Sequence, residues 1–169
     1  MNARGPITAS WLEAQADAAE AFALLLGLVA NRTLSGEELA VQERVSAWLR
    51  AHGLSVGIED VESGRPNVTT VLQNGEGPTL LINGHVNTVS IDPLWDPPRV
   101  LGIREGDRFF GLGAADMKAG VVAGMLATRA LDRTRKALTT SSTAVSEPTT
   151  ALSQNRAGIT PVSVHSAKS

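Results

Sequence analysis

Two stretches near the start of the chain carry apolar side chains at the spacing of an α-helix. Over 11–30, apolar residues recur every three or four positions, as they do on one face of a helix. The second stretch opens with Ser35-Gly-Glu-Glu38, where a hydroxyl and a carboxylate have capping-box spacing, and it ends at Gly53, which suits a left-handed stop. The pattern therefore predicts two helices, at 11–30 and from Ser35 to Gly53.

After Gly53 the spacing changes to the alternation and the short apolar runs that are typical of β-strands. Glycine, proline, asparagine and acidic residues separate these runs, and such residues favour turns. Apolar and small residues return to helical spacing after Asp116. Helices and strands mixed in this way predict a layered α/β or α+β domain. We expect strands at 54–61, 68–72, 79–82, 100–103 and 108–110, and a last helix at 116–131.

The composition of the chain changes after Arg133. From 134 to 169, 14 of 36 residues are Ser or Thr, and no apolar periodicity remains. A segment of this composition does not bury a core and is typical of disorder. We therefore divide the chain into a loose start at 1–9, a domain at 10–133 and a low-complexity, disordered tail at 134–169.

Charge and cysteine content narrow the classes of function. The net charge is −2 and the 15 Lys and Arg are scattered, which argues against a nucleic-acid partner. There is no cysteine, so a metal ion would be held by His, Asp or Glu. The most apolar stretch, 21–30, is too short to cross a membrane, and the acidic residues before it are unlike those of a signal peptide. We expect a cytoplasmic protein without a membrane partner.

Of the three histidines, His85 is the candidate for chemistry. His52 lies at the end of a predicted helix, where a cation is favourable, and His165 lies in the Ser/Thr-rich tail, where we expect it to be solvated. His85 follows a short apolar run and so lies where a buried strand ends, which is where open α/β sheets bind ligands. On position alone, His85 is either a structural histidine or a metal ligand.

A second candidate is Asp116, which lies between glycines at the start of the last predicted helix. It suits a helix cap as well as a metal ligand. A nucleotide loop is disfavoured, because a carboxylate at the third glycine position of a dinucleotide motif would repel a pyrophosphate. The Gly-Lys-Ser/Thr of a phosphate-binding loop is also missing from 113–118.

Taken together, the segments around His85 and Asp116 resemble a known family. Leu81-Ile-Asn-Gly-His-Val-Asn-Thr-Val89, then Trp95 in a proline-rich loop, then Gly111-Leu-Gly-Ala-Ala-Asp-Met-Lys118 are similar to the zinc-dependent aminoacylase and carboxypeptidase family. That family includes acetylornithine deacetylase, succinyl-diaminopimelate desuccinylase and glutamate carboxypeptidase. The resemblance covers about 17–133 and implies the amino-terminal part of a mixed-sheet, three-layer α-β-α domain.

The resemblance implies a role for each site residue. His85 matches a zinc ligand, and Asp116 matches the carboxylate that bridges two zinc ions. Asn87 stands where the family has an aspartate that orients the ligand imidazole. The implied cofactor is a pair of Zn²⁺ ions, for which Co²⁺ or Mn²⁺ can substitute, and the implied reaction is hydrolysis of amide bonds in N-acyl amino acids or small peptides. Homodimers are implied for the intact family, and we expect its dimerisation domain to be missing from this sequence.

Two departures from the family pattern limit the expected activity. Asn87 lacks the negative charge of an aspartate, which weakens the support for the imidazole. The adjacent Glu-Glu pair and the distal histidine of the family have no counterpart after Asp116. We therefore expect a truncated, inactive hydrolase; the alternative is a non-catalytic remnant that serves as a binding or interaction domain.

Overall fold

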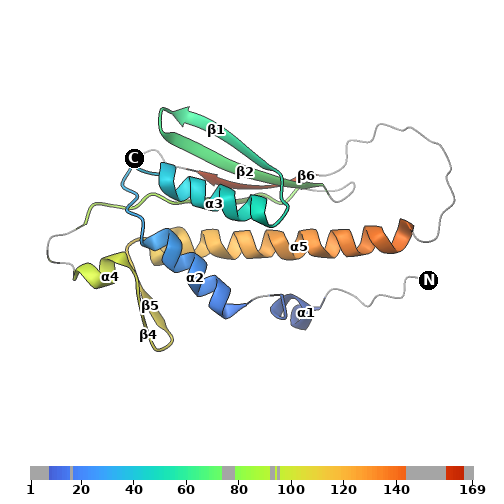
Figure 1. The fold of residues 1–169 in the computed structure, drawn as a ribbon, viewed down its shortest axis with the longest axis horizontal. Coiled ribbons are helices and arrows are strands. Elements are labelled where there is room, and N and C mark those ends of the chain that lie inside the picture. The colour runs from blue at the N-terminus through green and yellow to red at the C-terminus, as the bar shows by residue number, and fades with distance from the viewer. Residues whose placement is uncertain are drawn as a thin grey trace.

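A computed structural model describes residues 8–15, 17–73, 79–91, 94, 96–143 and 159–165 (Figure 1). Helices and strands are mixed along the chain, as the sequence predicts. In chain order the elements are α1 (Ala9–Glu13), α2 (Ala18–Val29), α3 (Leu39–Ala51), β1 (Val56–Glu62), β2 (Arg65–Gln73), β3 (Ile82–His85), α4 (Pro97–Leu101), β4 (Ile103–Glu105), β5 (Arg108–Phe110), the π-helical turn η1 (Ala114–Lys118), α5 (Ala119–Thr143) and β6 (Ile159–His165).

The helix expected at 11–30 is two helices, α1 and α2. The break has a local cause, because the carboxylate of Asp17 accepts hydrogen bonds from the backbone N–H groups of Ala19 and Glu20 and so starts a new helix there. The N–H of Trp11 donates to the hydroxyl of Thr8 in the same way at α1.

The second expected helix, α3, ends at Gly53 as predicted but begins later than Ser35. Gly53 has a φ of 73°, and the N–H of Leu54 bonds back to the carbonyl of Leu49. Gly36 also has a positive φ, 98°, so the chain before Leu39 is a turn. The predicted capping box is therefore wrong in its details: the Glu38 carboxylate accepts from the N–H of Gly36 instead of capping the helix.

The main sheet has the strand order β1-β2-β6-β3. The strands β1 and β2 form an antiparallel hairpin, β6 runs antiparallel to β2, and β3 runs parallel to β6. In the described sheet β3 is therefore an edge strand that pairs with β6 alone. A separate small hairpin joins β4 to β5.

Two expected strands differ from the structure. The strand expected at 79–82 begins only at Ile82 and runs to His85. Of the segment expected as a strand at 100–103, residues 100 and 101 end the short helix α4 and Ile103 begins β4. The helix forms because Pro97 and Pro98 occupy its first turn, where the fixed φ of proline favours a helix.

The part of the chain after Arg133 contains more regular backbone than its composition predicts. The helix α5 continues to Thr143, and neither glycine nor proline interrupts the sequence between Gly124 and Pro148. Residues 159–165 form β6. The rest of the predicted tail, 144–158 and 166–169, lies outside the described residues, as do 1–7 of the predicted loose start.

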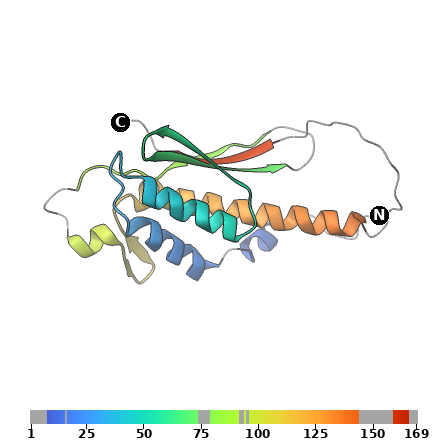
Figure 2. The ribbon, with the colours of Figure 1, turned by 45° about the horizontal axis from the view of Figure 1, so that its top comes forward.

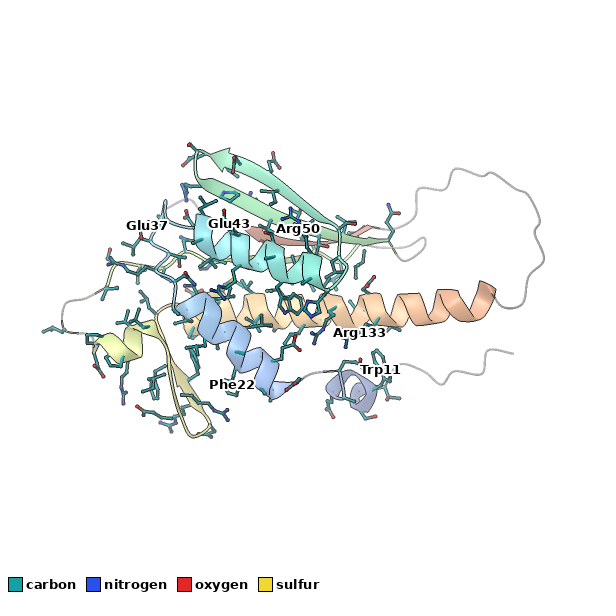
Figure 3. All side chains as sticks on the ribbon, in the orientation of Figure 1. Trp11, Phe22, Glu37, Glu43, Arg50 and Arg133 are labelled. Carbon is teal, nitrogen blue, oxygen red and sulfur yellow. The ribbon has the colours of Figure 1, made fainter. Side chains whose placement is uncertain are left out.

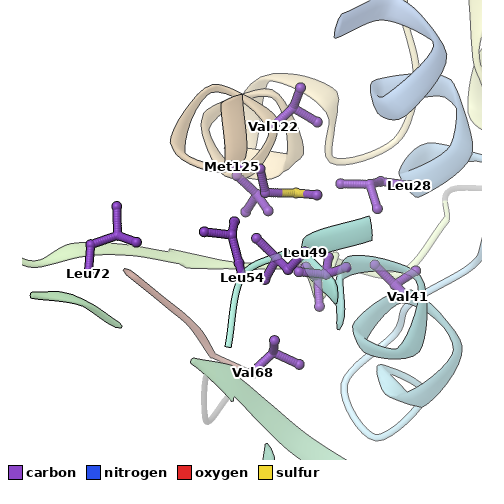
Figure 4. Packing of buried hydrophobic residues seen from close by; sticks show 11 residues of the cluster. Leu28, Val41, Leu49, Leu54, Val68, Leu72, Val122 and Met125 are labelled. Carbon is purple, nitrogen blue, oxygen red and sulfur yellow. The ribbon is translucent and has the colours of Figure 1, made fainter. Parts of the chain in front are cut away.

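The helices α2, α3 and α5 lie on one side of the main sheet (Figure 2). The core between them is apolar and nearly solvent-free (Figure 4). Alternation along β2 sends Val68 and Leu72 into this core, while Val71 on the opposite face is 41% exposed. The charged residues Glu43 and Arg50 of α3 are exposed (Figure 3). The core residues are Leu28, Val41, Val45, Leu49, Leu54, Val68, Leu72, Val86, Val121, Val122 and Met125.

The mixed α/β class is thus confirmed. Of the three expected layers, the described residues form a sheet and one layer of helices. Within the same residues, no helix is both long and apolar enough to cross a membrane.

Candidate metal centre

His85 is the last residue of β3, and its side chain is 29% exposed. Its Nδ1 lies 3.2 Å from the backbone carbonyl oxygen of Asn87. A carbonyl oxygen accepts hydrogen bonds and does not donate them, so the ring proton is on Nδ1. The Nε2 atom of neutral His85 is then left with its lone pair, which is the state in which an imidazole binds a metal ion.

Asp116 lies in η1, between a left-handed glycine and the start of α5. Gly113 has a φ of 72°, and a Cβ atom there would collide with the Thr88 side chain. Asp116 itself has φ −126° and ψ 94°, which is not helical, and its side chain is 90% exposed. The carboxylate makes no capping bond among the hydrogen bonds of the described residues, so the helix-cap interpretation of Asp116 is disfavoured.

The structure brings His85 and Asp116 together. Nε2 of His85 lies 3.3 Å from Oδ1 of Asp116. With the proton on Nδ1, these two atoms are both electron-pair donors, and they repel each other unless a cation lies between them. Either a second ring proton or a metal ion meets this need, and an imidazole nitrogen with a carboxylate oxygen is a donor set that suits Zn²⁺ or a similar ion. The pair therefore fits a divalent metal.

Asn87 supports His85 through its backbone. Its carbonyl oxygen accepts from the imidazole, whereas its side-chain amide donates to the hydroxyl of Ser35 at 3.3 Å. Ser35 lies four residues before α3 and takes part in this contact across the cleft. The neighbouring residue Thr88 donates its N–H to the carbonyl of Thr33 at 2.7 Å, so the loop before α3 holds the segment that follows β3.

A buried lysine fixes the turn that carries Asp116. The side chain of Lys118 is almost fully buried, and its Nζ donates to the carbonyl oxygens of Leu28 at 2.9 Å and Asn31 at 3.2 Å. Leu28 is in the last turn of α2, where helix carbonyls lack partners within the helix, and Asn31 follows the C-cap of that helix. Burial lowers the pKa of Lys118 to about 8. Lys118 is not among the site residues predicted from the sequence, although a lone lysine in a stretch of small and apolar residues was a usable signal.

An open cleft of about 820 Å³ surrounds the pair. His85, Asn87 and Asp116 all line it, together with Ser35 and Thr88. The cleft gives a small molecule access to Nε2 and Oδ1.

The described side chains supply only these two ligands. Among them, no group of three or more His, Asp or Glu residues is arranged to hold a metal ion. His52 lies at the end of α3, as predicted, with its Nδ1 2.8 Å from the Trp48 carbonyl. His165 differs from its predicted surroundings, because it is the last residue of β6 and its Cα pairs in register with that of His85.

Comparisons with known proteins show what the chain is similar to. Residues 81–148 match the model of peptidase family M20/M25/M40. An acetylornithine deacetylase from Aliivibrio fischeri is 41% identical over 80 residues, which cover 46% of this chain and 21% of that protein. An M20 family metallo-carboxypeptidase from Sulfolobus solfataricus has a similar fold, with a TM-score of 0.63 at 18% identity, covering 86% of this chain and 30% of that one. A dinuclear metal-binding peptidase of the M20 family from Bacillus subtilis gives a TM-score of 0.53 at 15% identity, covering 86% and 34%.

The chain spans about a fifth to a quarter of the length of the curated relatives it matches. This partial coverage fits the amino-terminal part of such a protein. The matches confirm the family resemblance and the mixed α/β peptidase-domain fold. Residues 81–148, the segment that carries His85 and Asp116, are similar to peptidase family M20/M25/M40.

Proposed function

We propose that the chain binds a divalent metal ion between His85 and Asp116, as part of a metal-dependent hydrolase of amide bonds. The observation that carries this proposal is the 3.3 Å approach of His85 Nε2 to Asp116 Oδ1, with the ring proton engaged on the opposite side by the Asn87 carbonyl. Two electron-pair donors held this close, at a strand end and in an open cleft, are a partial metal site.

Each residue has a distinct part in this proposal. His85 and Asp116 hold the ion, the backbone of Asn87 orients the imidazole, and Lys118 anchors the turn that presents Asp116. A divalent ion bound there supplies a Lewis acid that polarises an amide carbonyl and activates water. Zinc is the proposed ion, as a pair in the intact family; Co²⁺ and Mn²⁺ are alternatives, because imidazole and carboxylate ligands accept several metals.

The proposed substrates are N-acyl amino acids or small peptides. The support comes from the relatives, which are acetylornithine deacetylases, and from structural neighbours that are peptidases. A cytoplasmic location and the absence of a nucleic-acid partner remain predictions.

For the chain as printed, we propose metal binding with little or no turnover. The family's general base and further ligands have no counterpart after Asp116, and the described side chains supply two ligands where catalytic zinc sites usually have three. The same two-ligand count favours the second candidate function, a non-catalytic domain that retains part of the metal site.

One experiment separates these candidates. The purified chain is titrated with Zn²⁺ and Co²⁺, metal stoichiometry is measured, and hydrolysis of N-acetyl-ornithine is followed in parallel. We expect metal binding that His85→Ala and Asp116→Ala abolish and Asp107→Ala, an exposed carboxylate in the β4–β5 hairpin, leaves unchanged. Rapid turnover would overturn the proposed inactivity. Binding that is unaffected by His85→Ala would overturn the proposed site.

A further inference from the structure

Thr88 contacts both halves of the candidate metal centre. On one side, its backbone N–H donates to the carbonyl oxygen of Thr33 at 2.7 Å, and its hydroxyl donates to the same oxygen at 3.3 Å. On the other side, its Cγ2 methyl group lies against Gly113, where the turn that carries Asp116 begins. One residue therefore lies between the segment that follows His85 and the segment that leads to Asp116.

The backbone contact of Thr88 bears on the imidazole of His85. The N–H of Thr88 and the carbonyl of Asn87 belong to one peptide group, which is planar. Because Thr33 holds this N–H, it also fixes the direction of the carbonyl oxygen to which His85 Nδ1 donates at 3.2 Å. The orientation of the imidazole therefore depends on the hydrogen bond between Thr88 and Thr33.

Thr33 is itself held in place, which makes it a suitable anchor. It is fully buried, and its hydroxyl donates to the carbonyl oxygen of Val86 at 2.6 Å. The next residue, Leu34, forms a parallel β-bridge with Thr88. The segments 33–34 and 86–88 thus exchange hydrogen bonds in both directions, and this restrains the chain that follows His85.

The methyl contact of Thr88 bears on Asp116. Gly113 has a φ of 72° and no side chain, so its backbone can approach the methyl group more closely than another residue could. Its carbonyl oxygen accepts from the N–H of Lys118 at 2.9 Å across the turn, and Asp116 lies between these two residues. Loss of the methyl group would leave a gap beside the start of this turn and remove its packing contacts.

Resting on the proposed function, we propose that Thr88 is a positioning residue that sets the separation of His85 Nε2 and Asp116 Oδ1. Its N–H directs His85 through the carbonyl of Asn87. Its methyl group supports the turn that presents Asp116. Site residues need to be held within about 0.5 Å of the binding geometry, so a residue that locates both partners affects metal affinity more than it affects stability.

The test separates the methyl group of Thr88 from its hydroxyl. Thr88→Ser loses the methyl group, and it should weaken Zn²⁺ binding about 10-fold, the lower end of the effect of outer-shell partners. Thr88→Val, the conservative variant that keeps the methyl group and the backbone N–H, should restore most of this affinity. Competition with a zinc-binding dye measures both variants. Parent-like affinity in Thr88→Ser, or equal losses in the two variants, would overturn the proposal.

A control distinguishes positioning from a general loss of packing. Thr128 is a buried threonine of α5 whose hydroxyl donates to the carbonyl oxygen of Gly124 at 2.7 Å. Thr128→Ser also loses a buried methyl group, so it should lower the midpoint of urea unfolding and leave Zn²⁺ affinity unchanged. Circular dichroism checks that each variant folds. A loss of affinity as large as that in Thr88→Ser would assign the effect to stability and contradict the proposal.

The contact between Thr88 and Gly113 has a test of its own. Gly113→Ala adds a Cβ atom that meets the methyl group of Thr88, so it should weaken Zn²⁺ binding. In Thr88→Ser the methyl group is absent, and the same change should cost less affinity there, because residues in contact have non-additive effects. Losses that simply add in the double variant would overturn the proposed contact.

The same measurements distinguish this inference from the proposed function. If His85→Ala abolishes zinc binding while Thr88→Ser binds like the parent chain, Thr88 is not a positioning residue and the His85–Asp116 site stands. If the parent chain binds no zinc, the proposed function fails and this inference fails with it.

Discussion

The described part of the chain holds two histidine–carboxylate pairs, and they differ in whether the protein supplies a cation. His52 Nε2 lies 3.9 Å from Glu20, and the guanidinium of Arg129 bonds to both partners, at 3.3 Å to His52 and 2.6 Å to Glu20. His85 and Asp116 are closer, at 3.3 Å, yet among the described residues no lysine or arginine lies within ion-pair distance of Asp116.

The surroundings of the two pairs differ in the same way. Arg129 is buried, lies over the Trp48 ring at 5.2 Å and ties α5 to α2 and α3. Asp116 is exposed, and the nearby cation, Lys118, is directed away to the carbonyls at the end of α2. The first pair is a completed structural contact, and the second is a pair of electron-pair donors that suits an ion from solution.

The largest expected effect is on stability and comes from removing the guanidinium of Arg129. Arg129→Met should lower the free energy of unfolding by about 3 kcal/mol, because Glu20 loses a buried partner. The measurement is urea unfolding followed by circular dichroism. Arg99→Met is the matched control: this exposed arginine pairs with Glu105, and its loss should cost less than about 1 kcal/mol. Equal losses in the two variants would contradict the comparison.

The second prediction concerns His85 and Asp116, the pair that has no cation from the protein beside it. Zn²⁺ at one hundred times its Kd should stabilise the chain by about 2.7 kcal/mol, because the ion binds the folded state. Thermal unfolding with and without zinc, and after addition of a chelator, measures this increment. The increment should persist in Arg129→Met and vanish in Asp116→Asn. If the zinc increment were lost in Arg129→Met and kept in Asp116→Asn, the metal would bind near His52 and Glu20 and not between His85 and Asp116.

The third prediction uses the difference between the two buried cations. Arginine keeps its proton at any accessible pH, whereas the pKa of Lys118 is lowered from 10.5 to about 8. Between these values the unfolded chain binds a proton that the folded chain has released, so stability rises with pH. We expect a gain of about 2 kcal/mol between pH 8 and 10.5.

The chain suits this measurement because it lacks tyrosine and cysteine, and its other lysines are Lys136 and Lys168. The pH dependence is obtained from urea unfolding at several pH values. Lys118→Met should flatten the curve, and Lys136→Met should leave it as it is. A curve of unchanged slope in Lys118→Met would assign the effect to another group.

The smallest expected effect is that of Asn87→Asp. Restoring the family's carboxylate should raise Zn²⁺ affinity by less than about 10-fold, below the upper range for outer-shell partners. The reason is that the backbone carbonyl of residue 87 already accepts from His85, while the side chain contacts Ser35. Competition with a zinc-binding dye measures the change, with Asn83→Asp as the control. A gain near 100-fold would mean that the missing charge limits the site.

Local sequence signals predicted the elements whose causes are local. The helix predicted before Gly53 and the strand predicted at 108–110 are both present in the structure. The strand end at His85 and the glycine-flanked Asp116 predicted two site residues, and the structure brings them together.

Features that depend on residues far away in the sequence could not be predicted. Ser35 has the sequence of a cap, but Asn87, 52 residues later, bonds to its hydroxyl. Lys118 is recognisable as an anchor only when the end of α2 is seen beside it. The composition of 134–169 gave no sign of a strand, because β6 is defined by its pairing with β2 and β3.

The position of β6 has a consequence for the order of folding. The hairpin of β1 and β2 joins neighbouring segments and closes a short loop, so it can form early. The strand β3 pairs, in the described sheet, with a strand about 80 residues further along the chain, and contacts of such long sequence separation form slowly. The edge that aligns His85 is therefore among the last parts of the sheet to be assembled, and metal-binding competence should lag behind helix formation in a refolding experiment.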